Sequence, residues 1–175
     1  MPSICTRRAT IDDVDVLIAD VQAGFDSFVE FAPLGWVSPD VASDRDRFAE
    51  VLGHPGTWAM LALAGTDPVG HIAVTPARHR TVGRPWADSP FIPGLGHVWQ
   101  LFVLPAWWGR GIASLLHVSA IEELRTRGYQ TARLHTPSLN ARARRFYERH
   151  GWTATGERWN EDLVLMLTEY RRPLG

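Results

Sequence analysis

The segment that decides the fold of this 175-residue chain reads Leu101-Phe102-Val103-Leu104-Pro105-Ala106-Trp107-Trp108-Gly109-Arg110-Gly111-Ile112-Ala113-Ser114. An apolar run ends at a proline, passes through two glycines and enters an amphipathic pattern, which predicts a strand, a tight loop and a helix start. Glycines allow consecutive backbone N–H groups to face one ligand, and a helix start adds unpaired donors and partial positive charge. Such a loop is suited to bind phosphate or pyrophosphate.

Three kinds of phosphate loop can be compared with this segment. A Walker A loop requires a Gly-Lys pair, which the chain lacks. A dinucleotide-binding loop requires a third Gly or Ala where Ser114 stands, and an acidic residue after the next strand, where Thr136 and Pro137 stand. Residues 108–113 instead resemble the Gln/Arg-x-x-Gly-x-Gly/Ala signature of the Gcn5-related N-acetyltransferases, the GNAT family, with Trp108 at the first position.

A second block of sequence carries the same resemblance. Downstream of the glycine loop, the GNAT pattern of a strand, an Asn, and a short helix with Ala and Phe-Tyr is matched by Asn140, Ala143, Phe146 and Tyr147, and the helix closes at Gly151-Trp152. Asn is a good helix N-cap and Gly a natural left-handed C-cap. With two blocks in the family's order, the chain is identified as a member of the GNAT family.

The resemblance implies an α/β fold with a central, mostly antiparallel sheet, one splayed strand pair and helices on both faces. The residue pattern agrees with one mixed α/β domain spanning 1–175. It predicts strands over 3–8, 57–64, 67–75, 97–104, 131–136, 153–158 and 162–169, and helices over 11–25, 43–52, 112–127 and after Asn140. Two irregular segments remain, Glu30–Pro39 and Pro76–Gly96, and the second is long enough to suggest a binding loop.

Composition limits the partners and the compartment. The net charge of -1 argues against a nucleic acid or an anionic membrane surface as partner. The single cysteine, Cys5, forms no intramolecular disulfide and favours a reducing cytoplasm. The histidines show no metal-ligand spacing, so no metal site is expected. We expect a cytoplasmic monomer or homodimer without a membrane span.

The family resemblance implies transfer of an acetyl group from acetyl-CoA to a primary amine of a small molecule or peptide. It assigns the pyrophosphate to residues 108–114, with Arg110 as a further contact, and the pantetheine arm to the backbone of Phe102 and Val103 and to Asn140. It also makes Tyr147 the general acid, since a phenol can protonate a thiolate while staying neutral at pH 7. Packing beside Phe146 would explain Tyr147 equally well from the pattern alone.

The general base is left open by the sequence. No Glu lies between Glu50 and Glu122, and the central strand offers only His97 and Gln100. Three positions apart, these two are expected on opposite faces of the strand. His97 has an intrinsic pKa suited to accept a proton near neutrality. The alternatives are Glu161, Asp162 and Asp88.

Eight tryptophans are an unusual number for this length. Trp36 and Trp86 lie in the two irregular segments and Trp159 in the final hairpin, so we expect them to wall the amine site. Bulky anchors that pin loops to the core would explain them as well. Two other functions remain open: a catalytically silent acyl-CoA-binding module, and a protein N-terminal or lysine acetyltransferase.

Overall fold

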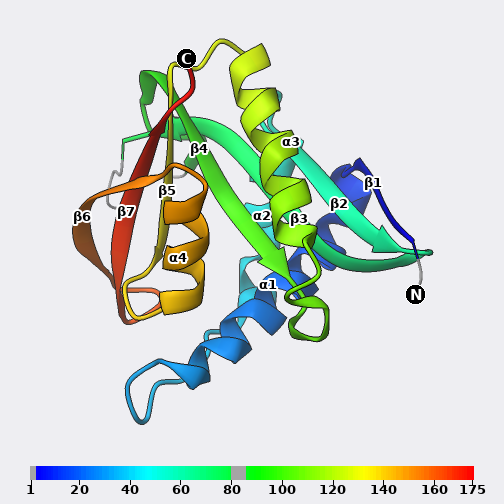
Figure 1. Cartoon of the computed structure of the whole chain (residues 1–175), viewed down its shortest axis with the longest axis vertical. Coiled ribbons are helices and arrows are strands. Elements are labelled where there is room, and N and C mark those ends of the chain that lie inside the picture. The colour runs from blue at the N-terminus through cyan, green and yellow to red at the C-terminus, as the bar shows by residue number, and fades with distance from the viewer. Residues whose placement is uncertain (1–2, 80–85) are drawn as a thin grey trace.

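A computed structural model describes residues 3–79 and 86–175. These form one seven-stranded sheet in the order β1-β2-β3-β4-β5-β7-β6, with helices packed on it (Figure 1). The strands are β1 (Ile4–Arg8), β2 (Trp58–Ala64), β3 (Asp67–Arg78), β4 (Phe91–Val103), β5 (Thr131–Pro137), β6 (Thr153–Asn160) and β7 (Leu165–Pro173). Neighbouring strands are antiparallel except β4 and β5, which are parallel.

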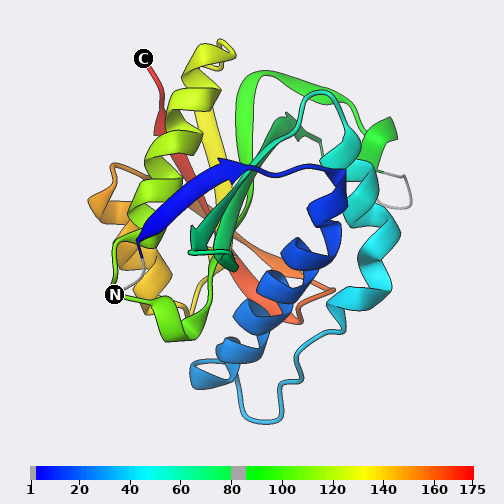
Figure 2. The same ribbon diagram turned by 90° about the vertical axis from the view of Figure 1, so that its right-hand side faces the viewer.

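Helices cover both faces of the sheet, as expected. The four α-helices are α1 (Val14–Asp26), α2 (Arg45–Gly53), α3 (Ile112–Thr126) and α4 (Ala141–Arg149). Figure 2 shows α3 and α4 on one side of the sheet and α1 and α2 on the other. Each face has its own apolar core, with Leu116 and Leu124 of α3 in one and Leu17 and Val21 of α1 in the other. Within the described residues, no helix is both long and apolar enough to cross a membrane.

The parallel strand pair is splayed. Its register runs only from Leu95 opposite Thr131 to His97 opposite Arg133. Beyond this point β4 continues to Val103 and β5 continues to its own end, and the two strands diverge towards the lower part of Figure 1. The gap leaves one backbone edge of β4 without a strand partner.

A β-bulge in β4 corrects the expected side-chain directions. Ala73 of β3 pairs with Gln100 whereas Val74 pairs with Val98, so Trp99 is an extra residue in β4. Because His97 pairs with Thr75, two positions from Ala73, His97 and Gln100 lie on the same face. The expectation of opposite faces was wrong, since one inserted residue inverts the alternation.

Several strand boundaries also differ from expectation, most of all in β3, β4 and the last strand. β4 begins at Phe91 and β3 ends at Arg78, so most of the described part of segment 76–96 is strand; residues 80–85 of that segment lie outside the described residues. The last strand runs from Leu165 to Pro173 and not over 162–169. The start of β4 was missed because it contains Pro93 and Gly94, two residue types that are rare in strands. Both lie between Phe91 and Gly96, where the register with β3 shifts, and such irregular positions accept Pro and Gly.

Candidate active site

A cleft of about 640 Å³ opens where β4 and β5 separate. On the side of α3 and α4 it is bordered by residues 107–109 and 111–114, by Asn140 and by α4, including Tyr147. On the opposite side it is bordered by α1, by residues 39–48 and by the turn between β6 and β7. The cleft therefore reaches both faces of the sheet through the gap between the two strands.

The glycine loop has the backbone geometry expected of an anion site. Gly109 and Gly111 have φ of +75° and +80°, values that favour glycine, and Gly111 is the N-cap of α3. A Cβ at either position would meet nothing within 4 Å, so the space above the loop is open. Residues 111–114 line the cleft, and there the first N–H groups of a helix lack intrahelical partners.

Trp108 stands where the family signature has Gln or Arg, and it joins the loop to β4. Its Nε1 donates a hydrogen bond to the Val103 carbonyl at 2.7 Å, and the Arg142 guanidinium lies 3.3 Å from its ring centroid. Arg110 lies over the Trp107 ring at 4.7 Å. Two arginines are thus held beside the loop by cation–π contacts.

Tyr147 reaches the cleft from α4. Its ring is buried against Phe146, Trp152 and Tyr170, while its hydroxyl has no hydrogen-bond partner in the described part of the chain. Burial raises the pKa of Tyr147, so the phenol stays neutral at physiological pH. Asn140 caps the same helix by accepting a hydrogen bond from Ala143 N at 3.1 Å.

His97 lines the cleft on the face of α1. Its Nδ1 lies 3.1 Å from the Arg133 carbonyl, which can only accept, so in the neutral ring Nδ1 carries the proton and Nε2 a lone pair. Burial, together with nearby Arg133 and His135, holds the pKa of His97 well below its usual value. Of the three alternative bases, Asp162 lines the cleft, whereas Glu161 and Asp88 do not.

A buried polar chain ends at the cleft, and the sequence analysis did not find it. His71 Nδ1 lies 2.9 Å from Asp20 Oδ2, and His71 Nε2 lies 2.9 Å from Gln100 Oε1. All three side chains are buried, and Gln100 lines the cleft. They come from α1, β3 and β4, so no spacing links them. The only sequence signal was a charged residue, Asp20, within the apolar stripe of α1.

Five aromatic side chains wall the cleft on the face of α1: Phe25, Phe28, Phe48, Trp99 and Phe102. The ring centroids of Phe25 and Phe102 are 5.7 Å apart, and those of Phe48 and Trp99 are 5.1 Å apart. Gly24 permits the α1 backbone to approach the Phe102 ring, because a Cβ there would overlap it.

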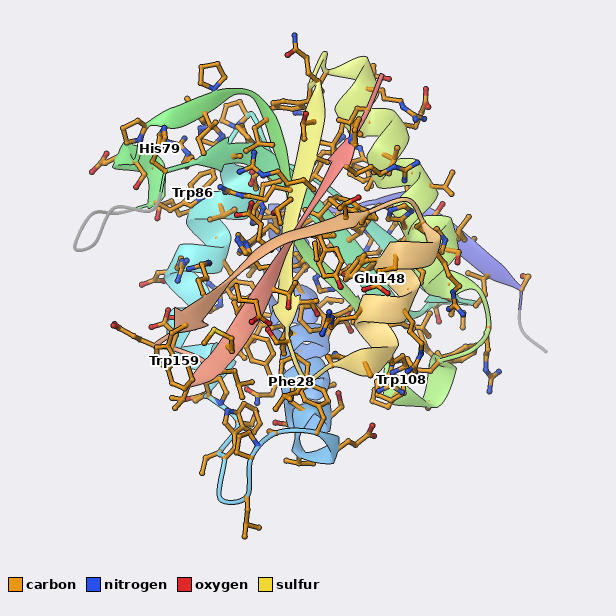
Figure 3. All side chains as sticks on the ribbon, turned by 60° about the vertical axis from the view of Figure 1, so that its left-hand side comes forward. Phe28, His79, Trp86, Trp108, Glu148 and Trp159 are labelled. Atoms are coloured by element: carbon orange, nitrogen blue, oxygen red, sulfur yellow. The ribbon has the colours of Figure 1, made fainter. Side chains whose placement is uncertain are left out.

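None of the three tryptophans expected to wall the amine site lines this cleft. Trp36 lies close to it and donates a hydrogen bond from Nε1 to the Leu163 carbonyl at 2.6 Å. Trp86 packs on His54 and Arg78, and Figure 3 shows it well away from Phe28 and Trp108. Trp159, on β6, is half exposed. Segment 30–39 borders the cleft through Pro39 and the final turn borders it through Asp162 and Leu163, whereas no described residue of segment 76–96 lines it.

The mixed sheet, the splayed strands and the glycine loop before α3 agree with one class of protein. Residues 22–152 match the family model described as "Acetyltransferase (GNAT) family". The chain belongs to the GNAT acetyltransferase family.

Particular relatives are similar to parts or all of the chain. "Mycothiol acetyltransferase" of Mycobacteroides abscessus is 33% identical over 120 residues, which cover 67% of this chain and 35% of that protein. The crystal structure of PaiA N-acetyltransferase from Thermoplasma acidophilum in complex with coenzyme A has a TM-score of 0.68 at 14% identity, over 98% of this chain and 99% of that one. An N-acetyltransferase from Staphylococcus aureus Mu50 has a TM-score of 0.72 at 17% identity, over 99% of both chains. These two structures share the fold.

Proposed function

We propose that the chain transfers an acetyl group from acetyl-CoA to a primary amine of a small molecule or peptide, by direct attack in a ternary complex. One observation carries this proposal. A single cleft passes through the sheet, with a glycine loop suited to pyrophosphate on one face and an aromatic-walled space on the other. A structural neighbour in complex with coenzyme A supports acetyl-CoA as the co-substrate.

The donor would occupy the side of α3 and α4. The N–H groups of residues 109–114 would bind the pyrophosphate. The edge of β4 beyond His97 faces the gap left by β5, so its backbone can pair there with the amide groups of a pantetheine arm as an added strand would. At Val103 the group left for such pairing is the N–H, because the carbonyl accepts from Trp108 Nε1, and the backbone groups of Phe102 beside it are turned to β3. Asn140 borders the same part of the cleft.

We assign the chemistry to two titratable groups that reach the cleft from opposite sides, His97 and Tyr147. The amine nitrogen attacks the thioester carbonyl carbon, and the carbon–sulfur bond breaks. His97 Nε2 accepts the proton from the attacking nitrogen, which becomes acidic as the nitrogen–carbon bond forms. Tyr147 donates its proton to the departing sulfur. The products are the N-acetylated amine and the CoA thiol.

The test is to incubate the protein with acetyl-CoA, a thiol reagent and a panel of primary amines, including peptides with free N-termini or lysines. Amine-dependent release of thiol is expected. Binding of acetyl-CoA without such release from any acceptor would favour a silent acyl-CoA-binding module. We further propose the reducing cytoplasm as the compartment, because Cys5 is an exposed free thiol.

A further inference from the structure

Gln100 has no part in the chemistry above, yet it occupies a central place in the cleft. It is 6% exposed, its Oε1 lies 2.9 Å from His71 Nε2, and it lines the cleft on the face of α1. Its amide nitrogen has no protein partner among residues 3–79 and 86–175. A nearly buried amide is normally satisfied at both ends, so the unpaired end is suited to a ligand.

The direction of the Gln100 amide follows from its two buried neighbours. The Asp20 carboxylate can only accept a hydrogen bond from His71 Nδ1, and the amide oxygen can only accept one from His71 Nε2. The structure thus places Gln100 Oε1, and not Nε2, against the His71 ring. Asp20 is itself buried, and a buried carboxylate is costly unless it is hydrogen-bonded, as Asp20 is to His71 Nδ1. With its oxygen held by His71, the amide turns its N–H donors towards the cleft.

An N–H donor at this point selects among amines. It is attracted to an oxygen of the acceptor molecule and gives nothing to an ammonium group. The surrounding walls are the aromatic rings of Phe25, Phe102 and Trp99, which favour an apolar body. We propose that the acceptor is a primary amine bearing a carbonyl or carboxylate oxygen and an apolar body, and that Gln100 Nε2 donates a hydrogen bond to that oxygen.

Asp20 and His71 act as positioning residues in this proposal, because they fix which end of the amide meets the substrate. The inference rests on the proposed function, since it describes the acceptor of the same reaction. A peptide N-terminus or an amino acid derivative with a large apolar side chain has the required groups.

Two amines test the proposal directly. L-phenylalaninamide and 2-phenylethylamine share the ring and the primary amine, but only the first has a carbonyl oxygen. We expect the wild-type kcat/KM, expressed per concentration of unprotonated amine, to favour the amide by about tenfold to a hundredfold, the range for one hydrogen bond to a buried donor. Equal kcat/KM values for the two amines would overturn the inference about Gln100 and leave the proposed function intact. If no amine causes release of CoA thiol from acetyl-CoA, the proposed function itself is overturned.

Three variants locate the selectivity. Gln100→Glu keeps an oxygen for His71 but replaces the donor, so the preference for L-phenylalaninamide should disappear, chiefly through its KM. Asp20→Asn replaces the carboxylate that holds His71. It should reduce the ratio of kcat/KM for L-phenylalaninamide to kcat/KM for 2-phenylethylamine. Gln130→Leu changes an exposed glutamine outside the cleft and is the matched control. This variant should keep the wild-type ratio of the two kcat/KM values.

Acetyl-CoA affinity measured by calorimetry shows that each variant is folded. A Gln100→Glu protein that binds acetyl-CoA normally and retains the wild-type preference would overturn the proposal. The ratio of two substrates is informative here because a general loss of stability lowers both rates together.

Discussion

At the residue scale, Tyr147 has a hydroxyl that no described residue hydrogen-bonds, inside a well-packed ring cluster. Tyr147→Phe keeps the ring contacts and removes the proton, so kcat should fall by about 10²- to 10⁴-fold, the range for general-acid assistance. Acetyl-CoA affinity should hardly change. Rapid-quench kinetics and calorimetry measure the two effects. Tyr170→Phe is the control, because the Tyr170 hydroxyl contacts Glu148 and Arg144 outside the cleft.

Unimpaired turnover of Tyr147→Phe, with chemistry shown to limit the rate, would leave Tyr147 as a core aromatic. The sequence alone could not decide between these roles, since an aromatic pair on a helix face is more often core. The structure shows that Tyr147 belongs to the core and borders the cleft at once.

His97 should set the acid side of the pH profile. Its pKa lies well below the ordinary value, so the imidazole is neutral near pH 7, and kcat/KM expressed per concentration of unprotonated amine should fall only when the pH drops through that lowered pKa. His97→Gln should reduce kcat/KM by about a hundredfold or more at neutral pH and alter this limb. A steady-state pH series measures both changes. A variant with the wild-type rate and profile would move the role of base to Asp162 or to water.

At the element scale, the sequence predicted those features that depend on local chemistry. The glycine loop, the Asn140 cap and the apolar stripes of α1 and α3 are local and were expected in place. The bulge at Trp99 was missed, because a bulge is defined by pairing with β3 and has no signature in β4 itself. That one residue decides which side chains share the face of His97, so the acceptor side of the site could not be derived from spacing.

The loop before α3 gives a prediction with a closely matched control. Gly111→Val places a β-branched side chain at φ +80° and in the space above the loop, so acetyl-CoA binding should be lost. Gly128→Val imposes the same strain at φ +81°, also in open space but outside the cleft. It should lower stability while keeping the affinity. Calorimetry measures the acetyl-CoA affinity of both variants. An unchanged acetyl-CoA affinity in Gly111→Val would exclude the loop as the binding site.

Segment 30–39 is joined to the final turn by the side chain of Trp36. The hydrogen bond from Trp36 to Leu163 joins two borders of the cleft that are far apart in sequence. Trp36→Ala should therefore raise the KM for the acceptor and leave acetyl-CoA affinity nearly unchanged, as expected for loss of binding to one substrate. Trp86→Ala, which alters packing on His54 and Arg78, should change neither constant. Weaker acetyl-CoA binding in Trp36→Ala would contradict this assignment.

At the scale of the whole molecule, several histidines are held neutral inside the fold. Burial, with His150 and Arg172 nearby, lowers the pKa of His117 to about 3, and burial with Arg158 and Arg133 lowers that of His135 to about 4. An unfolded histidine titrates near 6.5. Between these values the unfolded chain binds more protons than the folded one, so the free energy of unfolding rises with pH through this window. Stability is lost as the pH falls from about 6.5 towards 3.

His117 offers the clearest test of this loss, because its Nε2 accepts a hydrogen bond from Trp152 Nε1 at 2.9 Å in the core. His117→Gln retains an acceptor but cannot be protonated. Denaturant unfolding between pH 4.5 and about 7 should show a smaller loss of stability in this variant than in the wild type, by up to about 1.4 kcal/mol for each pH unit below 6.5. Carboxylates titrate equally in both proteins and cancel in the comparison. Parallel stability curves for the two proteins would mean that His117 is not held neutral by the fold.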